Sequence, residues 1–186
     1  MAETAKTRKF KTIDLAYIAL GAALIAACSW ISIPTTVPFT MQTFAVFFVL
    51  AALGGRRGTL SVLVYILIGA VGAPVFSNFQ AGVGVLLGST GGYIIGFLVT
   101  GLIYWLAVYL FGGKLWVTLA AMTVGLILLY AFGTAWFIFV YSRANGAIGL
   151  TAVLSWCVFP FILPDLVKLG LAVTLSRRLA PVLKIR

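Results

Sequence analysis

The sequence predicts an all-α integral membrane protein, a bundle of six transmembrane helices with a loop lid on the extracellular side. Of its 186 residues, 63% are hydrophobic and 9% are charged, and the mean hydropathy is +1.18. A soluble domain is about half apolar and about a quarter charged. Six helices of ~20 residues would use ~120 residues, which leaves only short loops and no room for a cytosolic nucleotide-binding domain.

Apolar runs and helix-breaking residues define the six expected spans in order. They cover residues 14–33, 41–53, 59–71, 93–111, 115–141 and 148–177. Proline or glycine marks the connections at 34–38, 54–58, 72–92 and 112–114, and a turn follows at 142–146. The second and third spans are short for a full crossing, so we expect irregular backbone at their ends that neighbouring helices bury.

The positions of the charges predict the orientation. With six spans, the loops at 34–40 and 72–92 share one side and carry no charge, and Arg143 is the single basic residue there. Setting Lys168 aside, the other eleven basic residues lie on the opposite side. The positive-inside rule therefore predicts a multi-pass plasma-membrane protein with both termini cytoplasmic. Nucleic-acid binding is disfavoured, because no soluble fold presents the basic clusters.

This orientation divides the chain into a basic tail at 1–13, a transmembrane domain at 14–179 and a second basic tail at 180–186. The first apolar segment lacks the features of a cleaved signal peptide, so we expect it to be retained as a helix. Cys28 and Cys157 both lie in apolar runs and are interpreted as small core residues. The chain contains no histidine and no cysteine cluster, so no metal site is predicted.

Asp165 is the only acid deep within apolar sequence, because Glu3 and Asp14 lie in or beside the N-terminal tail. Lys168 follows three residues later, on the same face if the segment is helical, and Pro160 and Pro164 precede it. An ion pair beside broken backbone in a membrane is typical of a binding site.

Uninterrupted helix would place Asp165 ~22 Å from the outer end and ~17 Å from the inner end of the last span, near the midplane. Alternatives are an ion pair that only orders the bundle, a proton-coupled secondary transporter with Asp165 as the proton site, and an intramembrane enzyme. An enzyme is disfavoured, because the chain offers no histidine and no partner carboxylate for acid–base chemistry.

The outer loops and the first span also carry candidate functions. The uncharged outer loops hold amide, hydroxyl and aromatic groups at 39–42, 74–80 and 88–93, which suit a neutral polar ligand but also suit ordinary turns. In the first span, Ala19, Ala23 and Ala27 recur at four-residue spacing, which permits close helix approach. Spacing alone leaves open whether this face packs inside the bundle or docks another membrane subunit.

Four motifs occur in order: Pro38-Phe39-Thr40-Met41-Gln42-Thr43, the segments at 72–76 and 88–97, and Pro160-Phe161-x-x-x-Asp165-Leu166-x-Lys168. Over residues 14–179 the chain thereby resembles the BioY family, the biotin-specific substrate-binding S components of energy-coupling factor (ECF) transporters. The resemblance implies six helices and a biotin pocket open to the outside. It also implies a first-helix motif, here Ala19/Ala23 or Ala23/Ala27, that docks on a transmembrane coupling subunit driven by two cytosolic ATPases.

The resemblance also implies roles at the site. Asp165 would accept from a ureido N–H of biotin and Lys168 would donate to the ureido carbonyl. The other candidate contacts are an amide at Asn78, aromatic packing by Tyr93, Phe39 and Phe79, polar groups at Thr40 and Gln42, and backbone N–H groups near Gly91. The chain departs from the family pattern at Ser89, where a proline is usual, and at Leu163-Pro164, where Pro-Gly is usual.

No cofactor is expected beyond biotin as the transported ligand. A phosphate-binding G-x-x-x-x-G-K-[ST] motif does not occur, so ATP would be used only by partner subunits. Some family members are thought to act without a dedicated coupling module. Hydropathy alone does not distinguish biotin from another vitamin.

Overall fold

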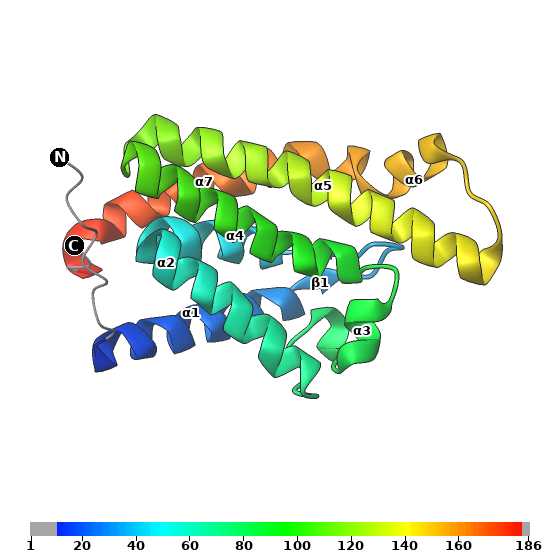
Figure 1. Ribbon diagram of the computed structural model, residues 1–186, viewed down its shortest axis with the longest axis horizontal. Helices are drawn as coiled ribbons and strands as arrows, with labels where there is room; N and C mark the ends of the chain where they lie inside the picture. Colours follow the sequence, from blue (N-terminus) through cyan, green and yellow to red (C-terminus); the bar gives the residue numbers. More distant parts are fainter. Residues whose placement is uncertain (1–10, 184–186) are drawn as a thin grey trace.

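The computed structural model describes residues 11–183, so residues 1–10 of the first predicted basic tail and 184–186 of the second lie outside the described residues. Seven α-helices, one short 3₁₀ helix and a two-stranded antiparallel hairpin make up this part of the chain (Figure 1). In order, they are α1 (Thr12–Trp30), β1 (Ser32–Ile33), β2 (Phe39–Thr40), α2 (Gln42–Ala70), η1 (Ser77–Phe79), α3 (Val83–Leu87), α4 (Gly91–Phe111), α5 (Leu115–Asn145), α6 (Leu150–Cys157) and α7 (Phe159–Leu183).

Five helical segments among the described residues are long and apolar enough to cross a membrane. They are α1, α2, α4, α5 and the combined α6–α7 segment. Many large apolar side chains are exposed on their outer surfaces, including Leu102, Leu106, Ile127 and Leu171. Such an apolar exterior suits lipid as the surrounding solvent, and the chain is a multi-pass membrane protein.

The difference between five segments and the six predicted spans lies in α2, which is a helical hairpin. Gly54 has φ 81° and ψ 169° and breaks the helix. The side-chain amide nitrogen of Gln42 lies 3.0 Å from the hydroxyl of Tyr65, whereas 23 residues of straight helix would separate them by about 35 Å. A Cβ at Gly58 would lie 2.7 Å from the Cα of Leu50. The two arms, 42–53 and 55–70, therefore lie side by side, and only small residues permit this approach.

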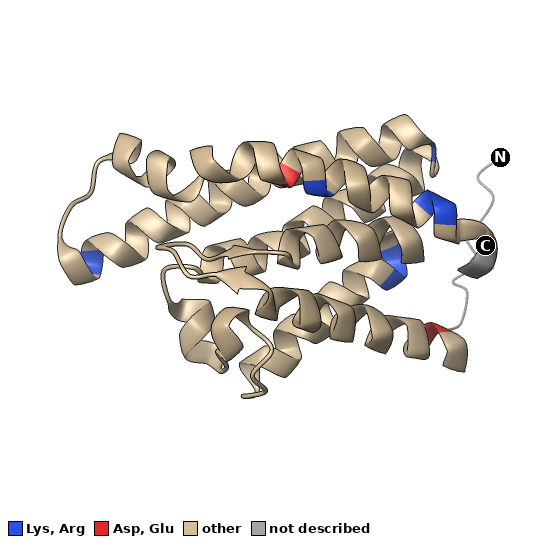
Figure 2. Ribbon diagram, turned by 180° about the vertical axis from the view of Figure 1, so that it is seen from behind, with Lys and Arg blue, Asp and Glu red and all other residues tan. Residues whose placement is uncertain are grey.

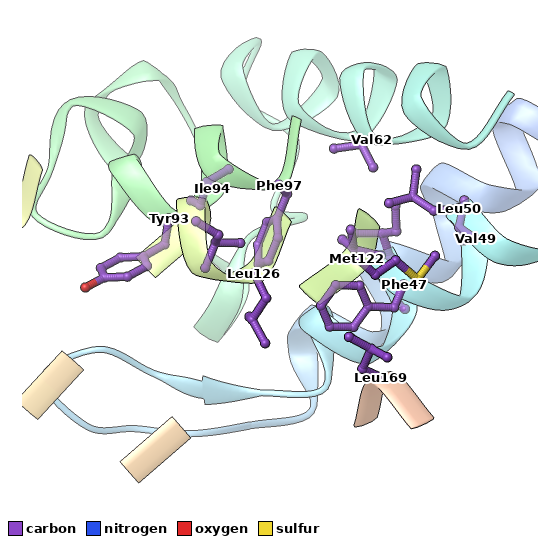
Figure 3. Packing of buried hydrophobic residues seen from close by; sticks show 14 of the residues in the cluster. Phe47, Val49, Leu50, Val62, Tyr93, Ile94, Phe97, Met122, Leu126 and Leu169 are labelled. Carbon is purple, nitrogen blue, oxygen red and sulfur yellow. The ribbon is translucent and has the colours of Figure 1, made fainter. Parts of the chain in front are cut away.

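Small residues also bring the helices of the bundle close together. The hydroxyl of Thr100 on α4 donates to the carbonyl of Gly125 on α5 at 3.0 Å, and that of Thr59 on α2 donates to the carbonyl of Gly101 on α4 at 2.8 Å. Such contacts are typical of helix packing in membranes. Between these helices, buried apolar side chains from α2, α5 and α7, among them Phe47, Met122 and Leu169, point toward one another (Figure 3).

The last span is broken earlier than predicted. Val158 leaves the helical region with φ −126° and ψ −60°, which separates α6 from α7. Pro160 falls in the first turn of α7, where its missing N–H is tolerated. Pro164 lies inside α7. The predicted last span at 148–177 is one apolar segment, but its helix is interrupted at Val158, before the two prolines to which the sequence assigned the interruption.

The charged residues are unevenly distributed along the long axis of the bundle. Among the residues described, Lys and Arg gather at the end where α1 begins and α7 ends, whereas the far end carries an isolated basic residue (Figure 2). Arg143, in the last turn of α5, accounts for the far position. An acid and a base lie together midway along the bundle (Figure 2).

Candidate ligand-binding site

A cavity lies inside the bundle, between the β1–β2 hairpin, the segment 76–90 and helices α2, α4, α5 and α7. The space within it where the centre of a water molecule can lie is about 80 Å³. One water needs roughly 10–15 Å³ by this measure, so the cavity is large enough for several. Aromatic and aliphatic side chains form most of the wall. Its polar members are Thr40, Gln42, Thr43, Ser77, Gln80, Thr90, Tyr93, Tyr130, Cys157 and Asp165.

A wider recess of about 400 Å³ adjoins the cavity at the end of the bundle opposite the start of α1. Pro38, Gln80, Val85 and Thr90 line both spaces, and Asn78 lines the recess alone. A cavity that adjoins a polar recess is typical of a small-molecule site with an entrance.

Asp165 and Lys168 form a buried ion pair on α7, as the three-residue spacing predicted. The ammonium nitrogen of Lys168 lies 2.9 Å from Oδ1 of Asp165, and the two residues are 5% and 3% exposed. Lys168 also donates to the carbonyl oxygen of Thr40 at 2.8 Å and lies 4.1 Å from the ring centroid of Phe39. Tyr130 on α5 donates to Oδ2 of Asp165 at 2.7 Å. Each buried charge thus has a charged partner and a further polar contact, as burial requires.

The pair presents an acceptor, not a donor, to the cavity. Asp165 is on the wall, whereas Lys168 lies behind it. Each carboxylate oxygen retains a second lone-pair direction beyond the bonds to Lys168 and Tyr130. Asp165 is therefore held in one orientation and remains able to accept hydrogen bonds from a ligand.

Gln42 and Tyr93 complete the polar wall on two other helices. The amide nitrogen of Gln42 donates to Tyr65, which leaves its carbonyl oxygen as an acceptor, and its backbone N–H bonds the hydroxyl of Thr40 at 3.2 Å. The hydroxyl of Tyr93 lies 3.2 Å from Oγ1 of Thr134 on α5. Three predicted site residues, Thr40, Gln42 and Tyr93, therefore share the wall with Asp165.

The other predicted contacts lie away from the cavity wall. Phe39 stacks on Phe161 with ring centroids 5.8 Å apart. Gly91 is buried, and a Cβ added to it would lie 1.8 Å from the carbonyl oxygen of Leu86. Phe79 is 62% exposed and stacks on Trp30. Asn78 accepts a hydrogen bond from the hydroxyl of Ser32 at 2.9 Å at the recess.

Tyr130 is a wall residue that the sequence did not indicate, and Ser77 and Gln80 lie on the wall within the loop 74–80 without having been among the individually predicted contacts. Tyr130 lies within an apolar run on α5, 35 residues before its partner Asp165. Nothing in that run distinguishes it from a tyrosine at the membrane interface. Ser77 and Gln80 flank the predicted residues Asn78 and Phe79 in the same loop. Only the backbone conformation decides which of these four side chains face the cavity.

The small residues of α1 separate into two faces. Gly21, Ala22 and Ala26 are buried, and a Cβ at Gly21 would lie 2.5 Å from the hydroxyl of Ser61 on α2. Ala19, Ala23 and Ala27 are exposed. Internal packing therefore uses a face of α1 other than the predicted docking face.

The fold and cavity define a multi-pass helical membrane protein with a largely apolar cavity among its helices that carries a few polar groups. The sequence profile of the BioY family matches residues 3–185, and the chain belongs to this family. The chain is 40% identical over 158 residues to the "Biotin transporter BioY" of Thermotoga maritima, covering 84% of this chain and 89% of that protein. It is 34% identical over 159 residues to the "Biotin transporter BioY2" of Lactococcus lactis subsp. cremoris, covering 85% of each.

A solved structure shows the same fold. It is a crystal structure described as the S-component for biotin from an ECF-type ABC transporter, and it superposes with a TM-score of 0.78 at 27% identity. The match covers 94% of each chain. These relatives are named as transporters, and none of their names denotes an enzyme.

Proposed function

We propose that this protein binds biotin and takes it up across the plasma membrane as the substrate-specific S component of an ECF-type ABC transporter. The names of its relatives support this function. The observation that carries it is the buried Asp165 carboxylate, oriented by Lys168 and Tyr130 and open to the cavity. No cofactor is proposed beyond biotin as the ligand.

The ureido ring of biotin suits this end of the cavity. Its N–H groups would bond Asp165 and the amide oxygen of Gln42. Two of the three ammonium donors of Lys168 are engaged by Thr40 and Asp165, and Lys168 does not line the cavity, so it would orient the Asp165 carboxylate rather than bond the ureido carbonyl. Tyr93 would pack against the ring system, and the tail would point toward the outer recess.

The two loops at the mouth would act as the lid. Val37 and Pro38 from the hairpin, Gln80 from the second loop and Val85 from α3 line the cavity. If each arm of α2 crosses once, with α6 and α7 forming one crossing, the bundle has six crossings. Both termini and the basic end would then be cytoplasmic by the positive-inside rule.

The exposed alanines of α1 would dock on the coupling subunit. Ala19, Ala23 and Ala27 face away from the bundle, so a second helix can approach them closely. The coupling subunit and two cytosolic ATPases would supply the energy, and transport without such a module is the alternative assembly.

Binding of labelled biotin to the purified protein tests the function. We expect tight binding by the unaltered protein, loss of binding in Asp165→Asn and Lys168→Ala, and no turnover of the ligand. Lys114→Ala removes an exposed cation at the start of α5 and is the matched control. A parallel panel of other vitamins tests ligand identity, and biotin uptake that depends on a proton gradient would favour a secondary carrier. Tight binding that survives both site substitutions would refute the assignment.

A further inference from the structure

The hydroxyl of Ser77 is a buried polar group without a hydrogen-bond partner among the described residues. It shares this property with Oδ1 of Asp14, but that oxygen lies 2.6 Å from a guanidinium nitrogen of Arg57. Ser77 has no such compensation, and it lines the cavity. A buried hydroxyl left unpaired costs free energy unless water or a ligand supplies the missing bond.

The backbone around Ser77 is held firmly. Phe76 is 1% exposed, and a Cβ at Gly69 would lie 2.2 Å from its ring, so the ring rests directly on α2. The backbone N–H of Phe76 donates to the carbonyl of Gln80 at 3.1 Å, and that of Gln80 donates to the carbonyl of Ser77 at 3.2 Å. The position of the hydroxyl is therefore built into the fold.

A strained turn decides which side chains face inward. Asn78 and Phe79 both adopt left-handed conformations, with φ 55° and 58°. Two successive left-handed residues other than glycine are costly, and such strain concentrates at ligand sites. The turn carries Asn78 to the recess and Phe79 to the surface, and it leaves Ser77 and Gln80 on the cavity wall.

Ser77 lines the cavity on the loop that connects it to the recess, because the next residue, Asn78, lines the recess. Gln80 and Thr90 line both the cavity and the recess, whereas Asp165 lines the cavity alone. Among the described wall residues of both spaces, Asp165 is the only charged one. A ligand anchored at Asp165 and extending outward therefore meets neutral hydroxyl and amide groups, with no cation.

We propose that the Ser77 hydroxyl donates a hydrogen bond to the carboxylate at the end of the ligand's tail. This inference rests on the proposed function, because it takes biotin as the ligand. It makes Ser77 a specificity-determining residue that recognises an anionic tail with a neutral donor. A hydroxyl suits this role because a hydrogen bond to a charged acceptor is stronger than a neutral one.

The test pairs one substitution with one change in the ligand. Ser77→Ala should raise the Kd for biotin roughly tenfold or more, the effect of losing one hydrogen bond to a charged group. For an analogue whose tail ends in a methyl group, Kd should be the same for Ser77→Ala and the unaltered protein. Ser155→Ala, on exposed α6, is the control and should bind biotin normally.

The free protein gives a second readout. Since the hydroxyl has no partner without ligand, Ser77→Ala should leave the thermal unfolding midpoint unchanged or raise it. An unchanged Kd for biotin, or equal weakening for biotin and the methyl analogue, overturns the assignment of Ser77. Failure of the unaltered protein to bind biotin overturns the proposed function itself, and this inference with it.

Discussion

Tyr130 on α5 donates a 2.7 Å hydrogen bond to Asp165 on α7, although the two residues are 35 positions apart. This bond connects two helices across the wall of the cavity. Together with Lys168, it holds both oxygens of a buried carboxylate in place. The acceptor that a ligand meets is therefore oriented before the ligand arrives, which lowers the ordering cost of binding.

Tyr130→Phe should weaken biotin binding while leaving the bundle folded. The change removes one hydrogen bond to a charged group, worth about 1.5–3 kcal/mol, so Kd should rise roughly ten- to hundredfold. Titration calorimetry on detergent-purified protein measures this effect. Tyr109→Phe, on an exposed tyrosine of α4, should bind as the unaltered protein does; equal affinities for both variants would show that the bond has no part in binding.

Lys168→Met should destabilise the fold by about 3–5 kcal/mol, because it leaves the Asp165 carboxylate buried without its counter-ion. The double variant Asp165→Asn with Lys168→Met removes both charges and should recover much of the loss in the thermal unfolding midpoint. It should still fail to bind biotin. Recovery of both stability and binding would mean that the pair only orders the bundle.

Gly58→Ala should destabilise the helical hairpin of α2 by roughly 1–3 kcal/mol, as overpacking does. The added Cβ would lie 2.7 Å from the Cα of Leu50, and backbone cannot move aside as a flexible side chain can. Gly170→Ala is the matched control, because it lies in α7 with nothing within 4 Å of the new Cβ. The unfolding midpoint of Gly170→Ala should stay the same or rise, because alanine has a higher helix propensity than glycine. A similar fall in both variants would argue against the close approach of the two arms.

Ala23→Trp should abolish cellular biotin uptake and leave binding to the purified protein intact. Ala23 is exposed on α1, so the bulk would obstruct a docking helix rather than the bundle. Ala131→Trp, at an exposed position of α5, controls for an added aromatic at the lipid surface and should transport normally. Loss of binding in Ala23→Trp would instead indicate a folding defect.

Part of the site was predictable from local spacing. Asp165 and Lys168 lie three residues apart, and one helical turn brings them together whatever the rest of the bundle does. Their partners, Tyr130 and the carbonyl of Thr40, come from distant segments, so no local pattern identifies them. The outer loop shows the same limit, because left-handed backbone at Asn78 and Phe79 places Asn78 on the recess and leaves Phe79 exposed.

Composition and sequence spacing determined the class of this protein. The features that did so are apolar runs of membrane length, basic residues that the predicted topology places on one side, and an acid–base pair three residues apart. Tertiary packing decided that α2 folds back at Gly54, that Gly21, Ala22 and Ala26 are buried while Ala23 stays exposed, and that Ser77 faces the cavity. The physical reason is the distance along the chain over which each effect acts. Hydrophobicity and helical spacing act within a few residues, whereas the approach of two helices depends on side chains that are far apart in the chain.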